Sequence, residues 1–368
     1  MTVRVGIIGT SWWADGMYLP ALQDHPHGKF VAVCGRNRET AQKLADTYGV
    51  PEVYTDYREM IASGKLDAII ISTPNDTHLA MTEAALNAGL HVMCEKPLAM
   101  NYAEAKRMAA LAAEKGVKHL VPYTYRHLPM YRYLKDLISG GYIGQPYQLN
   151  MRYNSGYGRA GEYMWRFDTR YGGTGVLGDL GSHFLHLAKL YFGPITGVYC
   201  KLSHRVPRVP LDPQGQPYTP TDDSALMTLA FANGAQGSVS VSSLCYEGTT
   251  FNQTHHMEFH GSEGTLYSDL DFNSTQEIRG AREEEGTPPA VMSIPELYWG
   301  NARRDTVKNT LRDVFRTQDF MTREFVTAIA ENTPLQPDFE EGLAIQRVLD
   351  ACALSDRERR WVDVEEIV

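Results

Sequence analysis

The sequence predicts an α/β protein in which a doubly wound parallel sheet precedes an α+β domain built on an antiparallel sheet. Up to about Pro122, short apolar runs alternate with helical patterns. After Tyr123 the strand patterns become longer and alternate apolar with polar residues. The 368 residues are also enough for two separate cores. We therefore expect domains at residues 1–122 and 123–368.

In the first domain, each buried strand is expected to lead into a helix. The predicted strands are Val3–Ile8, Phe30–Cys34, Ala68–Ser72, His91–Cys94 and His119–Pro122. The predicted helices are Glu39–Tyr48, Thr77–Ala88 and Ala103–Lys115. Strand and helix alternation of this kind produces a parallel sheet with right-handed crossovers.

The second domain is expected to combine one sheet with a few helices. The predicted strands are Tyr147–Tyr153, Gly197–Leu202, Ala225–Phe231, Ala235–Ser242, His256–His260, Thr265–Ser268 and Trp361–Val364. The predicted helices are Tyr131–Leu137, Ser182–Phe192, Thr322–Glu331 and Glu341–Ser355. Arg205–Asp222 is expected to be an exposed proline-rich loop, and Asp269–Asn309 an irregular segment that serves as a lid or an oligomer arm. Helices cover one sheet face, so the other is expected to be apolar and buried in a homo-oligomer.

Composition and charge narrow the class of partner. The chain has 44 acidic and 35 basic residues and a formal net charge of -9, which argues against binding to nucleic acid or to an anionic membrane. No apolar run approaches the roughly 20 residues of a membrane span, and the N-terminus lacks a signal-peptide layout. We therefore expect a cytoplasmic protein that binds small molecules. Its five cysteines are expected to be buried free thiols.

The turn after the first strand resembles a degraded dinucleotide fingerprint. Its residues are Gly9, Thr10, Ser11, Trp12, Trp13 and Ala14. The first glycine permits the tight turn, and small side chains let a pyrophosphate reach the amides at the helix N-terminus. The alternative is an ordinary strand-to-helix turn. Cofactor binding is favoured because the run Gly9–Ala14 follows the first strand of a pattern in which strands and helices alternate.

The end of the second strand bears on which dinucleotide is bound. A carboxylate there would select NAD, whereas Gly35 leaves space and Arg36 offers a guanidinium to a 2'-phosphate. NADP is therefore favoured, and NAD is the alternative. The competing interpretation is that Arg36 and Arg38 are solvated loop charges.

Two further strand ends carry polar residues that suit the nicotinamide half of a cofactor. The expected cofactor contacts are Ser72, Thr73, Pro74, Asn75, His78, Glu95, Lys96 and Pro97. Asn75 and Asp76 could instead cap the following helix. Ionisable residues at the end of a buried strand are costly unless they are used or paired, so the alternative for Glu95 and Lys96 is an internal ion pair.

The glycine-rich run Gly172–Gly181 introduces an acid/base pair. Asp179 and His183 are four apart, which places both side chains on one helical face. The glycines are expected to let substrate approach the backbone. Lys96 is the natural third member, because it ends a parallel strand where α/β folds bind ligands.

Other residues bear on the ligand and on metal binding. Aromatic and charged residues that suit a polyhydroxylated ligand occur at Tyr125, Arg126, Trp165 and Arg166. The spacing of Asp179, His183 and His186 would permit a metal, but no fourth ligand is evident, so we expect none. His255, His256 and His260 are expected to decorate a strand.

Together these motifs resemble the Gfo/Idh/MocA family, which includes glucose-fructose oxidoreductase and inositol dehydrogenase. The match covers the fingerprint turn, Thr73–His78, Glu95–Pro97, Trp165–Arg166, Gly172–His183, Phe259–Gly264 and Phe339–Val362. The resemblance implies a Rossmann domain, a C-terminal domain with a large open sheet that mediates dimers or tetramers, and a site between the domains. It also implies hydride transfer between nicotinamide C4 and a carbon of a sugar, cyclitol or related polyol. Three residues depart from the family pattern: Ser11, Tyr18 and His186.

Carried over by this resemblance, the catalytic residues are Lys96, Asp179 and His183. An imidazole is suited to accept the hydroxyl proton, so His183 is the expected acid/base. Lys96 is expected to stabilise negative charge on the reacting oxygen, and Asp179 to fix the substrate hydroxyl or the imidazole. With Tyr125, Arg126, Trp165 and Arg166, these residues form the expected substrate site. Two other functions stay open: a glycoside hydrolase that uses transient oxidation, and a non-catalytic sugar sensor.

Overall fold

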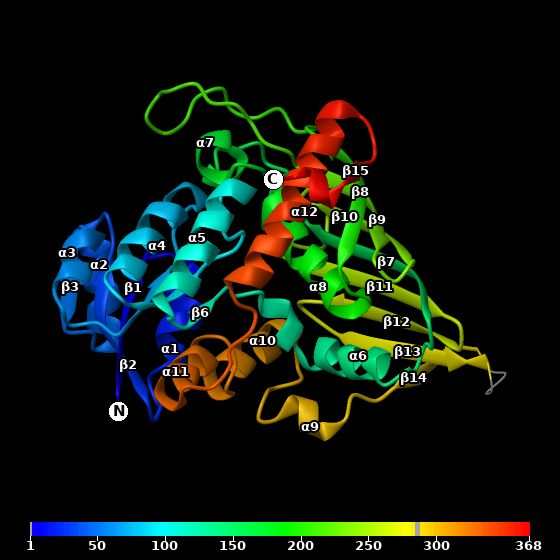
Figure 1. Cartoon of the computed structure of the whole chain (residues 1–368), viewed down its shortest axis with the longest axis horizontal. Coiled ribbons are helices and arrows are strands. Elements are labelled where there is room, and N and C mark those ends of the chain that lie inside the picture. The colour runs from blue at the N-terminus through cyan, green and yellow to red at the C-terminus, as the bar shows by residue number, and fades with distance from the viewer. Residues whose placement is uncertain (1, 284–287) are drawn as a thin grey trace. The chain divides into compact units, whose positions relative to one another are not determined.

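The computed structural model describes residues 2–283 and 288–368 and divides into two compact units. Unit 1 comprises Met1–Pro122 and Arg312–Ala344, and unit 2 comprises Tyr123–Leu311 and Ile345–Val368. Each unit is built around its own sheet (Figure 1). The expected boundary placed all of 123–368 in one domain, whereas in the structure 312–344 belongs to unit 1.

Within residues 2–122, six parallel strands form the sheet of unit 1, in the order β3-β2-β1-β4-β5-β6. The strands are β1 (Val3–Ile8), β2 (Gly28–Cys34), β3 (Glu52–Tyr54), β4 (Ala68–Ile71), β5 (His91–Cys94) and β6 (His119–Leu120). The prediction of a doubly wound parallel sheet is confirmed. The sequence did not reveal β3, which has three half-buried residues and so no apolar run to detect.

The helices of this part of unit 1 follow the strands in turn. They are η1 (Ala14–Tyr18), α1 (Leu19–Ala21), α2 (Arg38–Tyr48), α3 (Tyr57–Ala62), η2 (Asn75–Thr77), α4 (His78–Asn87) and α5 (Tyr102–Lys115). Asn37 and Asn101 cap α2 and α5 through their side chains, which satisfies backbone N–H groups at the helix starts. The chain order reverses at β1, with β2 on one side and β4 on the other. The carboxyl ends of β1 and β4 therefore form the switch point where such sheets bind ligands.

A C-terminal segment completes unit 1. Part of α10 (Val307–Thr317), all of α11 (Thr322–Glu331) and the start of α12 (Phe339–Glu358) belong to it. In Figure 1, α11 lies beside the N-terminal elements of this unit. The N–H of Val121 donates to the carbonyl of Pro337 at 2.9 Å, and Val326 is fully buried against Gly28. This packing explains why 312–344 folds with the parallel sheet.

In the described part of unit 2, nine strands form one sheet in the order β14-β13-β12-β11-β7-β10-β9-β8-β15. They are β7 (Pro146–Ser155), β8 (Ile195–Ser203), β9 (Ser224–Phe231), β10 (Gln236–Ser242), β11 (Gln253–Gly261), β12 (Gly264–Asp271), β13 (Gln276–Arg282), β14 (Ala290–Met292) and β15 (Val362–Asp363). Neighbours are antiparallel except β7 and β10. The prediction of a large, mostly antiparallel open sheet is confirmed.

Helical segments lie between these strands. They are η3 (Thr124–His127), α6 (Pro129–Ser139), η4 (Trp165–Phe167), α7 (Thr169–Gly172), η5 (Leu177–Gly181), α8 (Ser182–Phe192), α9 (Glu296–Trp299) and η7 (Val364–Glu366). The α8 helix packs on the sheet through aromatic contacts, with the Tyr191 ring 5.1 Å from that of Phe259. Among the described residues, no helix combines the length and apolar character that a membrane span requires.

The two faces of this sheet differ in chemistry. Apolar residues on one face are buried, including Leu149, Met151 and Met257. The opposite face of β11 carries His256, which contacts Asp269 at 2.6 Å and Glu258 at 3.0 Å. The expectation of a second broad apolar face is therefore wrong, because the alternate positions on β11 and its neighbours are mostly polar. Exposed apolar side chains on β8 and β9 are Tyr199 and Leu226.

The segment Asp269–Asn309 is more regular than expected. It contains β13, β14, α9 and the end of β12, and residues 284–287 of it lie outside the described residues. The alternation of β13 is weak in the sequence, because its two buried residues are Ile278 and Gly280 and only the first is a large apolar residue. On the outward face, Arg279 pairs across the sheet with Asp269 at 3.1 Å. No named strand or helix occurs in 205–222, all of which is described, yet Asp212 and Asp222 in it are buried. All five cysteines lie in the described ranges and are free thiols, four of them buried, as expected.

The contact between Gly28 and Val326 gives a test of how the C-terminal segment packs. A Cβ added at Gly28 would lie 2.4 Å from Cγ1 of Val326, a buried and stiff β-branched side chain. Gly28→Ala is expected to destabilise the protein by about 1–3 kcal/mol in urea unfolding. Adding Val326→Ala should relieve the clash. The double variant is therefore expected to lose less stability than the sum of the losses in the two single variants. Gly16→Ala is the control, because nothing lies within 4 Å of its Cβ position; equal losses at both glycines would contradict the packing account.

Candidate functional site

The turn after β1 is shaped by the backbone of the neighbouring strand. Gly9 has a φ of 116°, and a Cβ there would lie 2.1 Å from the carbonyl oxygen of Ser72. Only glycine fits this position. The Ser11 hydroxyl accepts from the N–H of Ala14 at 3.2 Å and lies 3.3 Å from the Ser72 hydroxyl. Ser11, which departs from the fingerprint glycine, thus links the ends of β1 and β4 and caps the following helical segment.

Thr10, Trp12 and Trp13 complete this turn. The Trp12 side chain is 71% exposed, and its ring meets that of Trp13 edge to face at 5.1 Å. Thr10 packs against the next strand end, because a Cβ at Gly35 would lie 2.6 Å from its methyl carbon. An aspartate or glutamate at position 35 would therefore displace Thr10. Arg36 is exposed and has no side-chain hydrogen bond or ion pair to any residue that the structure describes.

His78 ties two strand-end loops together. Its Nε2 lies 3.1 Å from the carbonyl oxygen of Thr73, and its Nδ1 lies 3.1 Å from that of Pro97. Burial lowers the pKa of His78, although the surrounding carbonyl groups oppose the shift. His78 therefore positions these loops from behind rather than facing a ligand. The alternative interpretation, in which Asn75 and Asp76 cap the following helix, is not observed, because the N-cap residues of η2 and α4 are Pro74 and Thr77, and neither makes a side-chain cap bond.

Glu95, Lys96 and Pro97 follow the buried strand β5. The Tyr18 hydroxyl donates to Oε1 of Glu95, and the backbone N–H of Lys96 donates to Oε2 of Glu95 at 3.1 Å. Lys96 is half-buried and belongs to unit 1. The Glu95 carboxylate is thus held by groups on both of its oxygens.

These features fit a dinucleotide. The turns after β1, β2, β4 and β5 all lie at the carboxyl edge of one parallel sheet, where the chain order reverses. Gly9 keeps the first turn free of a side chain that would fill it. The half-buried and exposed polar groups of Thr10, Ser11 and Arg36 suit phosphate and ribose oxygens.

In unit 2, Asp222 anchors the glycine-rich run. Its carboxylate accepts from the N–H groups of Gly175 at 2.8 Å and Leu177 at 2.7 Å. Burial raises the pKa of Asp222, and these N–H groups oppose the shift. A Cβ at Gly175 would lie 2.0 Å from the Asp222 carbonyl oxygen, and one at Gly172 would lie 2.6 Å from that of Arg166. These two glycines therefore make room for the chain's own backbone, which corrects the expectation that they admit substrate.

Asp179 and His183 lie on consecutive helical segments, η5 and α8. The Tyr157 hydroxyl donates to Oδ2 of Asp179 at 2.8 Å, and Nε of Arg166 lies 3.3 Å from Oδ1. The Arg166 guanidinium in turn stacks on Trp165, 4.4 Å from the ring centre. Burial and the negative charge of Asp179 raise the pKa of Tyr157 well above its usual range, so Tyr157 remains a donor. The structure thus gathers Trp165, Arg166 and Asp179 and adds Tyr157, which the sequence analysis missed.

His183 lies against a second group of aromatic side chains. Its ring is 4.5 Å from that of Tyr125, whose hydroxyl lies 2.8 Å both from the Tyr153 hydroxyl and from Oε1 of Gln253. Tyr153 and Gln253 come from β7 and β11, and nothing local in the sequence marked them. Arg126 is half-buried on η3 beside Tyr125.

Two further histidines of unit 2, His186 and His255, pack in its core. His186 stacks on Tyr123 at 4.3 Å with an interplanar angle of 6°, and His255 is buried on the inner face of β11. Across residues 2–283 and 288–368, no group of three or more His, Cys, Asp or Glu side chains is arranged to hold a metal ion.

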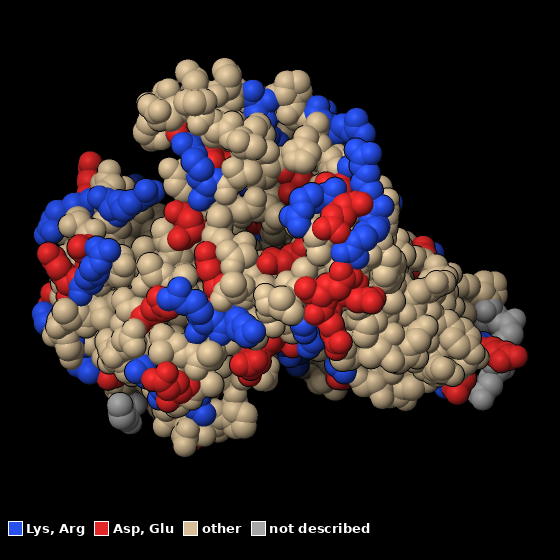
Figure 2. Space-filling model, turned by 45° about the horizontal axis from the view of Figure 1, so that its top comes forward, with Lys and Arg blue, Asp and Glu red and all other residues tan. Residues whose placement is uncertain are grey.

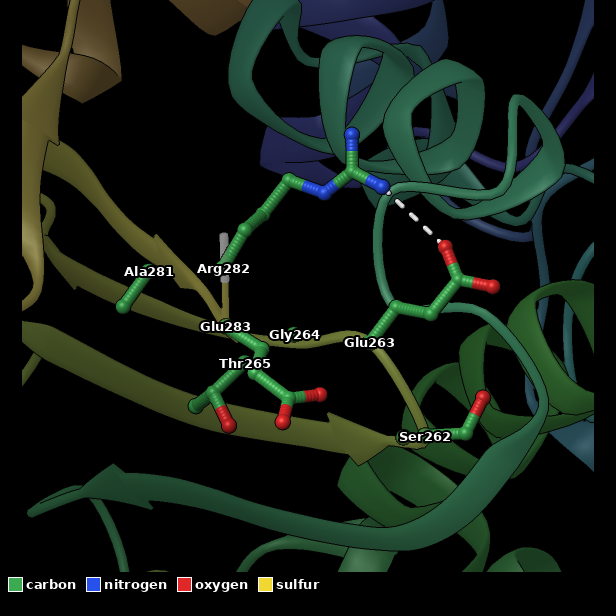
Figure 3. A pocket seen from close by; sticks show the side chains of 8 residues that line it. Ser262, Glu263, Gly264, Thr265, Ala281, Arg282 and Glu283 are labelled. Atoms are coloured by element: carbon green, nitrogen blue, oxygen red, sulfur yellow. Dashed lines mark hydrogen bonds and ion pairs between the residues drawn. The ribbon is translucent and has the colours of Figure 1, made fainter. Parts of the chain in front are cut away.

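Two surface features, the distribution of charge and one hollow, lie apart from the expected site residues. Lys and Arg side chains are interspersed with Asp and Glu over the face drawn in Figure 2, so no continuous basic stripe is seen there. An open hollow lies where β12 and β13 meet, and the ion pair of Arg282 and Glu263 spans part of it at 3.1 Å (Figure 3). Residues 261–265 and 281–283 line this hollow, and none of the expected site residues is among them.

Comparison with known proteins identifies the family. The model of the oxidoreductase family with an NAD-binding Rossmann fold matches residues 3–123, and that of the family's C-terminal alpha/beta domain matches residues 135–364. The chain belongs to the Gfo/Idh/MocA oxidoreductase family. The resemblance drawn from its motifs is confirmed, and the chain is an NAD(P)-binding member of that family.

Several relatives in this family are named for sugars. Levoglucosan dehydrogenase of Pseudarthrobacter phenanthrenivorans is 28% identical, with 95% of this chain and 91% of the relative covered. D-apiose dehydrogenase of Paraburkholderia graminis is 24% identical over 98% of this chain and 89% of the relative. A solved levoglucosan dehydrogenase in complex with NADH and levoglucosan is 26% identical, with a TM-score of 0.85 over 99% of this chain and 100% of that chain.

Proposed function

We propose that this protein transfers a hydride between a nicotinamide dinucleotide and a carbon of a sugar, cyclitol or related polyol. The observation that carries the proposal is the Asp179 carboxylate, held by Tyr157 and Arg166, one helical turn before His183. Such a cluster offers an acceptor for a substrate hydroxyl and a group that exchanges a proton. The sugar-active relatives support the same class of substrate.

Each residue has a defined role in this proposal. His183 accepts the proton of the reacting hydroxyl, because an imidazole can take up and release a proton near neutral pH. The Lys96 ammonium donates to the same oxygen and stabilises its developing negative charge. Asp179 accepts a hydrogen bond from a substrate hydroxyl, and the aromatic faces of Tyr125 and Trp165 cover its C–H groups.

The cofactor is proposed to lie along the carboxyl edge of the parallel sheet in unit 1. A bound NAD(P) supplies the hydride acceptor or donor. The residues proposed to hold it are Gly9, Thr10, Ser11, Trp12, Trp13, Gly35, Arg36, Ser72, Thr73, Pro74, Asn75, Glu95, Lys96 and Pro97, with His78 behind them.

Removing either proposed catalytic group tests the function. Lys96→Ala and His183→Ala are each expected to lower turnover by at least ~100-fold, the scale for losing a proton-transfer or charge-stabilising group. Affinity for the dinucleotide should change only a few-fold. Absorbance at 340 nm with a panel of sugars and polyols measures turnover, and near-normal turnover in either variant removes that residue from the mechanism.

The Tyr157 hydroxyl gives a second test. Tyr157→Phe removes a donor from the Asp179 carboxylate, a bond of about 1.5–3 kcal/mol, so kcat/KM for the sugar should fall roughly ten- to a hundredfold. Tyr163→Phe is the matched control, since the Tyr163 hydroxyl donates to the carboxylate of Asp168 at 3.1 Å. Equal losses of activity in the two variants would show that Tyr157 contributes only to stability.

Arg36 is proposed to favour NADP over NAD. Charge-assisted bonds to a 2'-phosphate, worth about 1.5–3 kcal/mol, give a preference of roughly ten- to a hundredfold. Arg36→Ala should remove most of it. The kcat/KM values for both dinucleotides decide this, and a wild-type preference for NAD, or one unchanged by the substitution, contradicts the proposal.

We also propose a homodimer or homotetramer held by the sheet of unit 2. Tyr199 and Leu226 are exposed on adjacent strands of its outer face, where a second copy would cover them. Sedimentation at micromolar concentration is expected to show an oligomer that Leu226→Asp weakens. A wild-type monomer under these conditions would argue against the assembly.

A further inference from the structure

The first observation is a buried hydrogen bond between two strand-end segments of unit 1. Tyr18 ends η1, which follows the fingerprint turn, and its side chain is 1% exposed. Its hydroxyl donates to Oε1 of Glu95, a residue that follows β5. The two residues are 77 positions apart. This bond therefore joins the first turn of the parallel sheet to the loop that carries Lys96.

The second observation is where the other oxygen of Glu95 lies. Oε2 accepts from the backbone N–H of Lys96 at 3.1 Å. This N–H belongs to the peptide that leads from the buried strand into the loop, so the Glu95 side chain bends back over its own backbone. A carboxylate held on both oxygens has its plane fixed, and the Lys96 backbone is fixed with it.

Tyr18 is suited to this role over a wide pH range. Burial and the negative charge of Glu95 raise the pKa of Tyr18 well above its usual range, whereas Trp13 acts in the opposite direction. The Tyr18 hydroxyl therefore keeps its proton and remains a donor. The Trp13 ring packs edge to face on Tyr18 with centroids 6.4 Å apart, so the aromatic ring of Tyr18 is held as well.

We propose that Tyr18 is a positioning residue for Lys96, acting through Glu95. Tyr18 fixes the Glu95 carboxylate, Glu95 fixes the Lys96 backbone, and the ammonium group is thereby aimed at the reacting oxygen. The inference rests on the proposed function of Lys96. It adds that the segment after the cofactor turn sets the geometry of this lysine.

The test compares Tyr18→Phe, Glu95→Gln and the double variant with wild type. Tyr18→Phe keeps the buried ring and removes only the donor. Tyr48→Phe is the matched control in the same unit, because the Tyr48 hydroxyl lies 2.6 Å from the carbonyl oxygen of Asp15 and 2.8 Å from its Oδ1, so it bonds to η1 but not to Glu95. Two quantities are measured: hydrogen–deuterium exchange of the peptide 92–99 in the protein without dinucleotide, and kcat with separately determined dinucleotide affinity.

Tyr18→Phe is expected to raise exchange in 92–99 several-fold and to lower kcat about ten- to a hundredfold, the scale for a lost bond to a charged group. Dinucleotide affinity should stay within about threefold, and Tyr48→Phe should leave exchange and kcat unchanged. In the Glu95→Gln background, adding Tyr18→Phe should cost little more, because residues that act through one another are not additive.

Two results would overturn the inference. One is unchanged exchange and kcat in Tyr18→Phe, and the other is the same loss from Tyr18→Phe in both backgrounds. If Tyr18→Phe does not fold, Glu95→Gln alone must raise exchange in 92–99, and unchanged exchange there is decisive against the link. Failure of the proposed function gives a different pattern, because Lys96→Ala then retains wild-type turnover. The exchange measurement on 92–99 does not depend on turnover, so it still tests whether Tyr18 and Glu95 hold the Lys96 backbone.

Discussion

The buried carboxylate of Asp222 fixes where the helical segment with Asp179 and His183 begins. The first N–H groups of a helix have no partner inside it, and burying them unpaired is costly. Asp222 satisfies those of Gly175 and Leu177, and Gly175 has no side chain to keep the two segments apart. The direction of the helical segment, and hence the position of Asp179 beside Tyr157 and Arg166, depends on this contact.

In unit 1, side chains also satisfy backbone groups that lack partners in a helix or strand. Loops after parallel strands have no ladder of their own, so their backbone groups need other partners. His78 bridges the loops after β4 and β5, and Ser11 bridges the turns after β1 and β4. Polar side chains, the buried His78 and the exposed Ser11, thus hold the edge of the sheet in one conformation.

The elements that could be predicted are those whose signal lies in a short stretch of sequence. The strands β1, β4 and β5 are apolar runs, and the spacing of Asp179 and His183 is visible without a structure. In contrast, β13 is stabilised by pairing with β12, and Ile278 is the one large apolar residue on its buried face, so the strand has no clear apolar pattern. The residues that support the site were missed for the same reason. Tyr157 is 22 positions from Asp179, and Asp222 is 45 from Leu177, so neither pairing leaves a local pattern.

The return of residues 312–344 to unit 1 has a consequence for synthesis. While the chain leaves the ribosome, β1 to β6 emerge long before Val326 and Pro337, which cover Gly28 and pair with Val121. Unit 2 is completed later still, because Ile345–Val368, with the edge strand β15, follows residues 312–344 in the chain. Unit 1 therefore lacks part of its packing until residues 312–344 have emerged, and until then the nascent protein exposes apolar surface, the state in which chaperones bind.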